Sequence, residues 1–330
     1  MANLDLIKSE QGPRLAFLEK AEVNVIAETL VAFANTEGGT IIRSEFIKHG
    51  DGKTASFVLM DESAQRVYLA QTGLIGGTFP THKTVMNFSG DKALKDGSNE
   101  LVVKFESPEV GGVKLVKSYV LQRGSYVVTV KHEVINAGGA PVSPQLYLQL
   151  VRDGNKPPGE SSFYSTFTGP AVYTDAKKYQ KVEFSDIEKG KAEIEKTSST
   201  GYVAMVQHYF ASAWMLADGL VREYFARKVD NNLFAVGMIT PLKDIAPGAT
   251  QSVESRFFVG PQEEKVLESL APGLELVKDY GWLTILAKPL YMLLSMIHGF
   301  VGNWGWAIVL LVVLLKAAFY WLNASAYRSM

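Results

Sequence analysis

The spacing of hydrophobic and polar residues changes character along the chain. From residue 21 to 259, short segments alternate, or nearly alternate, between apolar and polar positions, which is the period of half-buried strands. Turn-forming sequences such as Gln-Arg-Gly at 122–124 separate neighbouring segments. We therefore predict a mainly β domain built as an antiparallel sandwich. The predicted strands are 113–121, 126–134, 145–151, 202–210, 220–229, 233–239 and 251–259.

Helical spacing appears only near the C-terminal end. Residues 261–270 predict a short helix with its leucines turned inward. From 283 to 299, leucine and isoleucine recur every three or four residues, which predicts an amphipathic helix begun or bent at Pro289. Aromatic residues typical of a membrane–water boundary lie around it: Trp282, Tyr291, Trp304 and Trp306. This helix fits the membrane interface, and it also fits a helix packed on the surface of the β domain.

The most apolar segment of the chain follows. Between Phe300 and Leu322 the only charged side chain is Lys316. A helix of this length covers the about 30 Å hydrocarbon layer of a bilayer, so we predict a transmembrane helix at 300–323. A mid-membrane lysine costs about 2.5–3.5 kcal/mol on insertion scales. Each leucine, isoleucine or valine returns about 0.3–0.6 kcal/mol, so the segment is still expected to insert.

The charge in this segment has polar neighbours at helical spacing. Tyr320 and Asn323 follow Lys316 by four and seven residues, which places all three on one helix face. A polar stripe on an apolar membrane helix is typical of contact with protein or water. The alternative is that the lysine side chain extends to the lipid headgroups. Lys316 is the main candidate site residue, with Tyr320 and Asn323 as secondary candidates.

Composition excludes several other functions. The chain has 33 basic and 34 acidic residues and a net charge of −1, which argues against a nucleic-acid partner. It has no cysteine, so disulfides, thiolate metal sites and cysteine nucleophiles are excluded. The five histidines show no metal-ligand spacing, and no phosphate-binding or nucleophile-elbow motif is present. We predict no catalytic site, metal or cofactor, and structural roles for His132 and His208 in strands.

Two further segments leave alternatives open. Residues 1–20 are rich in charge and lack a signal peptide, so either a leading transmembrane helix is missing or the domain stays in the cytosol behind a tail anchor. Arg328 follows the predicted span while 299–306 have no basic residue, which favours a cytoplasmic C-terminal end. The irregular stretch at 153–174 fits either the lining of a cleft or a cover over a sheet edge.

Several motifs resemble the YidC-type membrane protein insertases of Gram-negative bacteria. The most specific are Gly-Asn-Trp-Gly-Trp-Ala-Ile at 302–308 and Leu-Lys-Ala-Ala-Phe-Tyr-Trp-Leu-Asn at 315–323. Further matches lie at 71–74, 168–173, 209–214, 258–261, 270–276, 280–284 and 326–330. The similarity covers about residues 21–330. Compared with the family, the chain lacks the leading helix and ends after the first of five membrane helices, so we expect a fragment truncated at both ends.

The resemblance implies a fold and a division of the chain. It implies a periplasmic β-super-sandwich, related in fold to sugar mutarotases, followed by helices that enter the inner membrane. The expected parts are an unassigned segment at 1–20, the sandwich at 21–260, a helical linker at 261–282, an interfacial helix at 283–299, a transmembrane helix at 300–323 and the start of a cytoplasmic segment at 324–330.

The resemblance also implies a function. Family members insert, fold and assemble integral membrane proteins, alone or with the Sec translocase, through a hydrophilic groove within the bilayer. Lys316 occupies the position of the groove's single basic residue, often arginine in relatives; lysine keeps the charge without the bidentate geometry. The implied partners are nascent membrane proteins, Sec translocase components and lipid, and no enzyme activity is implied. The alternatives are a membrane-anchored carbohydrate-binding or mutarotase-like sandwich, and a docking domain for the translocase.

Overall fold

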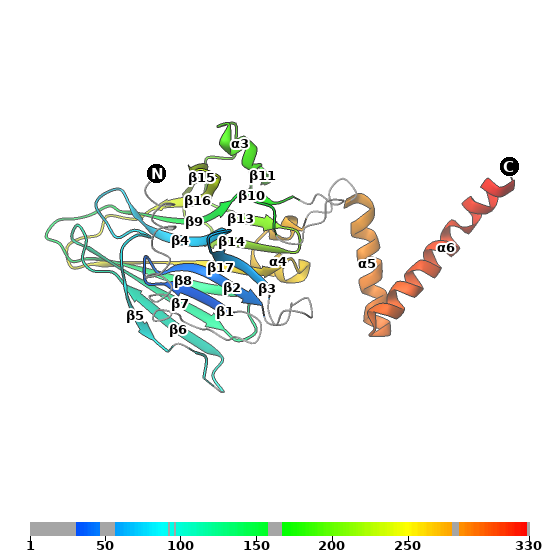
Figure 1. The fold of residues 1–330 in the computed structure, drawn as a ribbon, viewed down its shortest axis with the longest axis horizontal. Coiled ribbons are helices and arrows are strands. Elements are labelled where there is room, and N and C mark those ends of the chain that lie inside the picture. The colour runs from blue at the N-terminus through cyan, green and yellow to red at the C-terminus, as the bar shows by residue number, and fades with distance from the viewer. Residues whose placement is uncertain are drawn as a thin grey trace. The chain divides into compact units, whose positions relative to one another are not determined.

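A computed structural model describes residues 31–46, 57–91, 93–95, 97–157, 167–278 and 284–328. Within these ranges the side chains of 31–33, 284–288 and 321–328 are not described. The chain divides into two compact units, Met1–Lys278 and Asp279–Met330. The first unit is a β domain and the second consists of two helices (Figure 1).

Two antiparallel sheets form the first unit, as predicted from the alternating pattern. The eight-stranded sheet has the order β1 (Val31–Asn35), β2 (Thr40–Phe46), β3 (Phe57–Glu62), β4 (Val67–Ile75), β9 (Gln145–Asp153), β16 (Leu233–Pro241), β15 (Arg222–Asp230) and β12 (Thr197–Ser198). The nine-stranded sheet has the order β11 (Lys178–Lys181), β10 (Gly169–Thr174), β13 (Tyr202–Gln207), β14 (Phe210–Leu216), β17 (Thr250–Pro261), β8 (Val127–Asn136), β7 (Val113–Gln122), β6 (Glu100–Glu106) and β5 (Asn87–Gly90).

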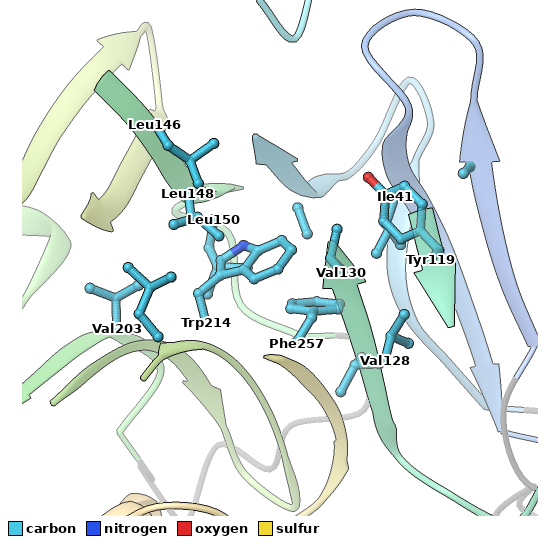
Figure 2. Packing of buried hydrophobic residues seen from close by; sticks show 14 of the residues in the cluster. Ile41, Tyr119, Val128, Val130, Leu146, Leu148, Leu150, Val203, Trp214 and Phe257 are labelled. Carbon is cyan, nitrogen blue, oxygen red and sulfur yellow. The ribbon is translucent and has the colours of Figure 1, made fainter. Parts of the chain in front are cut away.

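The main core lies between the inner faces of the two sheets. Trp214 of β14 is fully buried, and its ring packs on Phe257 of β17 at a centroid distance of 4.6 Å. Its indole N–H donates to the carbonyl of Gln149 in the opposite sheet at 3.2 Å. Figure 2 shows these rings beside the inward leucines of β9 and the valines of β8. Because each large buried aromatic removes about 150–250 Å² from water, this layer is the main source of the domain's stability.

Two expectations about strands are corrected. The run at 202–210, predicted as one strand, contains β13, a turn at His208 and Tyr209, and the start of β14. His208 therefore lies in a turn rather than within a strand. In the stretch at 153–174, β10 is a fully buried strand paired with β13 and β11. The remainder of that stretch falls largely on 158–166, outside the described residues.

Short helices cover parts of the sandwich. Helix α3 (Phe184–Glu188) packs Phe184 on Phe234 of β16, with ring centroids 4.9 Å apart. Helix α4 (Glu264–Leu270) and the 3₁₀ helix η2 (Leu274–Val277) pack on the outer face of the nine-stranded sheet. Leu267, Leu274 and Val277 are fully buried there. The outer face of β13 and β14 is therefore apolar as well as the inner one.

The second unit is a helical hairpin of α5 (Thr284–Val301) and α6 (Trp304–Arg328). Gly302 adopts a positive φ of 68° in the turn, and its N–H donates to the carbonyl of His298 at 2.7 Å. The His298 ring stacks on Trp304 at a centroid distance of 3.8 Å. Asn303 caps α6, because its side-chain oxygen accepts the N–H of Trp306 at 3.2 Å.

The helices of the described residues were expected to include a membrane span. None of them combines the length and the apolar character that crossing a bilayer requires. The transmembrane helix predicted at 300–323 is therefore not confirmed, although this range lies almost entirely within α6.

Candidate functional site

The predicted site residues lie on α6. Lys316 and Tyr320 are exposed, one helical turn apart, and the side chain of Asn323 lies outside the described residues. Ala307 is fully buried and Leu311 and Leu315 are half-buried, so these positions mark the less exposed side of α6. Lys316 is adjacent to this less exposed side and forms no ion pair within the part of the chain that the structure describes. The helical spacing of α6 brings Lys316 and Tyr320 together, and the hairpin does not enclose them.

The exposed surface of α6 is otherwise apolar. Val309, Val312, Val313 and Leu314 each expose between 44% and 56% of their surface. A contiguous apolar surface of this kind marks an interface with protein or lipid rather than with water. Lys316 and Tyr320 are thus the polar features of a helix whose other exposed side chains favour apolar surroundings.

A second polar site, which the sequence patterns did not reveal, lies inside the sandwich. Lys117 of β7 is fully buried, and its ammonium donates to the carbonyls of Gly38 and Thr72, each at 2.6 Å. Tyr119 donates to the carbonyl of Gly39 at 2.5 Å. These contacts tie the β1–β2 turn and β4 to the opposite sheet. No carboxylate pairs with Lys117 among the described residues.

His132 of β8 completes this interior cluster. It is the cross-strand neighbour of Lys117, is fully buried, and its Nε2 lies 3.0 Å from the hydroxyl of Thr72. Burial lowers the pKa of Lys117 from 10.5 to about 7. Burial and, secondarily, the Lys117 charge lower the pKa of His132 to about 3. The structural role expected for His132 is confirmed, and its lack of exposure excludes contact with a ligand.

The signal for this cluster was present in the strand period. Along β7 the buried odd positions are Val113, Leu115, Lys117, Tyr119 and Leu121, so Lys117 takes an inward place among apolar residues. His132 similarly follows Val128 and Val130 at inward positions of β8. A charged residue in phase with the core positions of a strand marks a buried polar group.

A surface groove of about 680 Å³ lies beside β11, β12 and β15. Its charged lining includes Lys177, Lys196, Glu193 and Glu223, and Phe225 contributes an aromatic surface. The lining contains no histidine. The groove thus lacks the histidine–carboxylate pair that acid–base isomerisation of a sugar would use.

Comparison with solved structures gives distant likenesses in fold. A galactose mutarotase-like protein from Clostridium acetobutylicum has a TM-score of 0.47 and 8% identity, covering 71% of this chain and 93% of that protein. A galactose mutarotase related enzyme from Lactobacillus acidophilus has a TM-score of 0.43 and 9% identity, covering 70% of this chain and 94% of that protein. Likenesses at this level carry no information about activity.

Comparison with known sequences is far more specific. A membrane protein insertase YidC of Cupriavidus necator is 52% identical over 309 residues, which are 94% of this chain and 55% of that protein. A membrane protein insertase YidC of Burkholderia cenocepacia is 53% identical over 300 residues, 90% of this chain and 54% of that protein. The chain thus spans about half the length of the curated relatives it matches. Because the family model of the YidC periplasmic domain also matches residues 22–293, the chain belongs to the YidC periplasmic domain family.

Proposed function

We propose that this chain provides the periplasmic domain and the first groove helix of an inner-membrane protein insertase. The observation that carries the proposal is the identity of about half the residues with proteins named membrane protein insertase YidC over nearly the whole chain. Its substrates are nascent integral membrane proteins, and its partners are the lipid bilayer and the Sec translocase. No covalent bond changes in this role, so the protein is not an enzyme.

The proposal assigns the two helices of the second unit to the membrane. Residues 283–299 lie in the interface, residues 300–323 span the bilayer, and residues 324–330 begin a cytoplasmic segment. The exposed valines and leucines of α6 support this assignment, because they avoid contact with water only in apolar surroundings. The sandwich is then on the periplasmic side.

Lys316 has the central role in the proposed mechanism. Its ammonium attracts acidic groups of the inserting segment and keeps a groove within the bilayer hydrated. The attraction is stronger there than in water because the surroundings have a low dielectric constant. The polar part of a substrate stays in the groove while its apolar part moves into lipid. Tyr320, one turn away, and Asn323 add hydrogen-bonding groups on the same face.

The test uses a chimera in which residues 31–330 replace the matching part of the Cupriavidus necator relative. Lys316→Ala and Lys316→Glu are expected to reduce the insertion of single-span substrates into proteoliposomes, with the larger loss for the reversed charge. Lys316→Arg, which keeps the charge, is expected to retain most of the activity. Unchanged insertion rates in both the alanine and the glutamate variants would refute the proposed role.

A carbohydrate-isomerising function is not favoured. His132 is buried and hydrogen-bonded to Thr72, away from any ligand. His208 lies in the β13–β14 turn, and it does not line the groove beside β15. Neither of these two histidines therefore lies at the groove beside β15, where an acid and a base could act on opposite sides of a sugar.

A further inference from the structure

We propose that the β13–β14 end of the sandwich contacts the lipid headgroup layer through Tyr209, an inference that rests on the proposed membrane position of α5. This end is where the chain leaves the sandwich. The N–H of Gln262 donates to the carbonyl of Tyr209 at 2.8 Å. The side chain of Gln262 also donates to the carbonyls of Gln207 and Phe210, at 3.0 and 3.1 Å. The entry to α4 is thereby joined to the hairpin tip.

The last described residue of the sandwich unit returns to the same end. The side-chain nitrogen Nζ of Lys278 lies 4.0 Å from the carboxylate oxygen Oε2 of Glu264, the first residue of α4. From Lys278 the chain reaches Thr284, the start of α5, in steps of about 3.6 Å, which allow a separation of at most about 22 Å. This limit holds for every arrangement of the two units. An interfacial α5 therefore keeps the β13–β14 end close to the bilayer.

The tip has the side chains that a headgroup layer favours. Among the large apolar side chains described in the sandwich unit, Tyr209 has the largest exposed fraction, 69%. The ring of His208 packs against it at a centroid distance of 3.8 Å. Tyrosine places an apolar ring and a polar hydroxyl at the two sides of a membrane–water boundary. The turn itself, His208 and Tyr209, contains no acidic residue, whereas Glu263, which follows Gln262, is exposed.

The tip is also held rigidly. Phe210, the next residue, is buried. Its ring stacks on those of Phe57 and Phe46, at centroid distances of 4.2 and 5.3 Å. An exposed ring on a fixed hairpin loses little conformational entropy on binding. The turn also contains no lysine or arginine, so the contact has no requirement for anionic lipid. We therefore assign the tip to a zwitterionic headgroup layer.

The absence of cysteine makes the test direct, because a single thiol can be labelled anywhere in the full chain. His208→Cys places an environment-sensitive fluorophore beside an intact Tyr209. Ala140→Cys is the matched control, since β8 runs ten residues, about 30 Å, from the hairpin end to Asn136, and Ala140 lies exposed just beyond. Val312→Cys reports on α6. Each labelled chain is reconstituted in phosphatidylcholine vesicles containing lipids with nitroxide on the headgroup or the acyl chain.

Three results are expected together. The label at 208 shows blue-shifted emission, quenching by headgroup nitroxide, and several-fold lower quenching by aqueous iodide than the label at 140. Adding Tyr209→Ser to the His208→Cys chain restores iodide quenching toward that of the control. The label at 312 is quenched by acyl-chain nitroxide.

The same labels separate failure of this inference from failure of the proposed function. If acyl-chain nitroxide quenches the label at 312 while iodide reaches the label at 208 as readily as that at 140, the tip does not contact lipid. If iodide reaches 312 and 208 alike, the membrane position of α6 and the contact at Tyr209 are both wrong.

Discussion

Lys117 shows how much a single buried charge constrains this fold. Its side chain is fully enclosed, and its partners are the carbonyls of Gly38 and Thr72 rather than a carboxylate. Taking an ammonium out of water without a counter-charge is unfavourable, which is why its pKa falls to about 7. Its two hydrogen bonds join the β1–β2 turn to β4 and β7, so the residue links the two sheets at the cost of a pH-dependent stability.

Stability should rise with pH above neutrality because of this residue. The pKa of Lys117 is about 7 in the folded chain and 10.5 in the unfolded one, so between these values the unfolded state binds more protons. Raising the pH across this window therefore favours folding, by up to about 5 kcal/mol in the limit of the full shift. Chemical denaturation at pH 7 and pH 9 measures the free energy of unfolding. Between these two pH values, this free energy is expected to rise less in Lys117→Met than in the unchanged chain. Equal rises in the two proteins would contradict this account.

Gly73 of β4 occupies a position with no room for a side chain. An added Cβ would lie 2.8 Å from Cζ of Tyr147, its cross-strand partner, and 2.9 Å from Cα of Thr81. Tyr147 is itself held by His82, whose Nδ1 lies 2.5 Å from the phenol oxygen. Gly73→Ala is therefore expected to destabilise the domain by about 1–3 kcal/mol in thermal or chemical unfolding.

Gly139→Ala provides the matched control for Gly73→Ala. Gly139 is exposed, has no heavy atom within 4 Å of an added Cβ, and is absent from the positive-φ residues. Its substitution should leave stability unchanged or slightly higher. Equal effects at the two glycines would show that the close approach of Tyr147 does not constrain β4.

The sequence patterns identify exposed residues, and charges within apolar runs, more readily than buried polar residues. Lys316 is visible as the only charge in a long apolar run. Lys117 is less visible because β7 also carries Lys114, so a second lysine in the strand looks like another outward-facing polar residue. Only the strict period of two separates half-buried Lys114 from fully buried Lys117, and the acceptors of Lys117 come from residues distant in sequence.

At the scale of elements, the ranges of several strands were predicted well, whereas the division between β13 and β14 was missed. β7 and β8 alternate, and their predicted ranges lie within one or two residues of the observed ones. β13 and β14 are buried at every position, because the core lies on one side and α4 with η2 on the other. With no alternation between them, the two-residue turn at His208 and Tyr209 left no signal in the apolar run.

The docking of η2 on the nine-stranded sheet gives a prediction at this scale. Leu274 is fully buried, and the adjacent carbonyl of Gly273 accepts the hydroxyl of Tyr202 at 2.6 Å. Leu274→Ala is expected to cost about 2–4 kcal/mol and to raise hydrogen exchange at 264–277 before the rest of the sandwich. Leu276→Ala, at a position 40% exposed, should change exchange little. Uniform loss of protection across the domain in Leu274→Ala would show that η2 is not a separate docking element.

At the scale of the whole molecule, local patterns specify strands but not their order. Neighbours such as β4 with β9, β9 with β16 and β8 with β17 are distant in sequence, and their pairing depends on the shared core rather than on turns. The sandwich class was therefore predicted from alternation. The order of the strands within the eight- and nine-stranded sheets is known only from the structure. The family assignment came from motifs in strands as well as in helices and loops, and the comparisons confirm the family.

The proposed function depends on a substrate segment meeting one face of α6. Site-specific photo-crosslinking in the chimera with the Cupriavidus necator relative measures this contact directly, with the crosslinker at 316, at 320 or, on another face, at 314. A single-span substrate arrested during insertion is expected to crosslink at 316 and 320, while position 314 reacts with lipid or with neighbouring helices. Equal substrate crosslinking at 314 and 316, or crosslinking to lipid alone at all three positions, would contradict a substrate groove at Lys316.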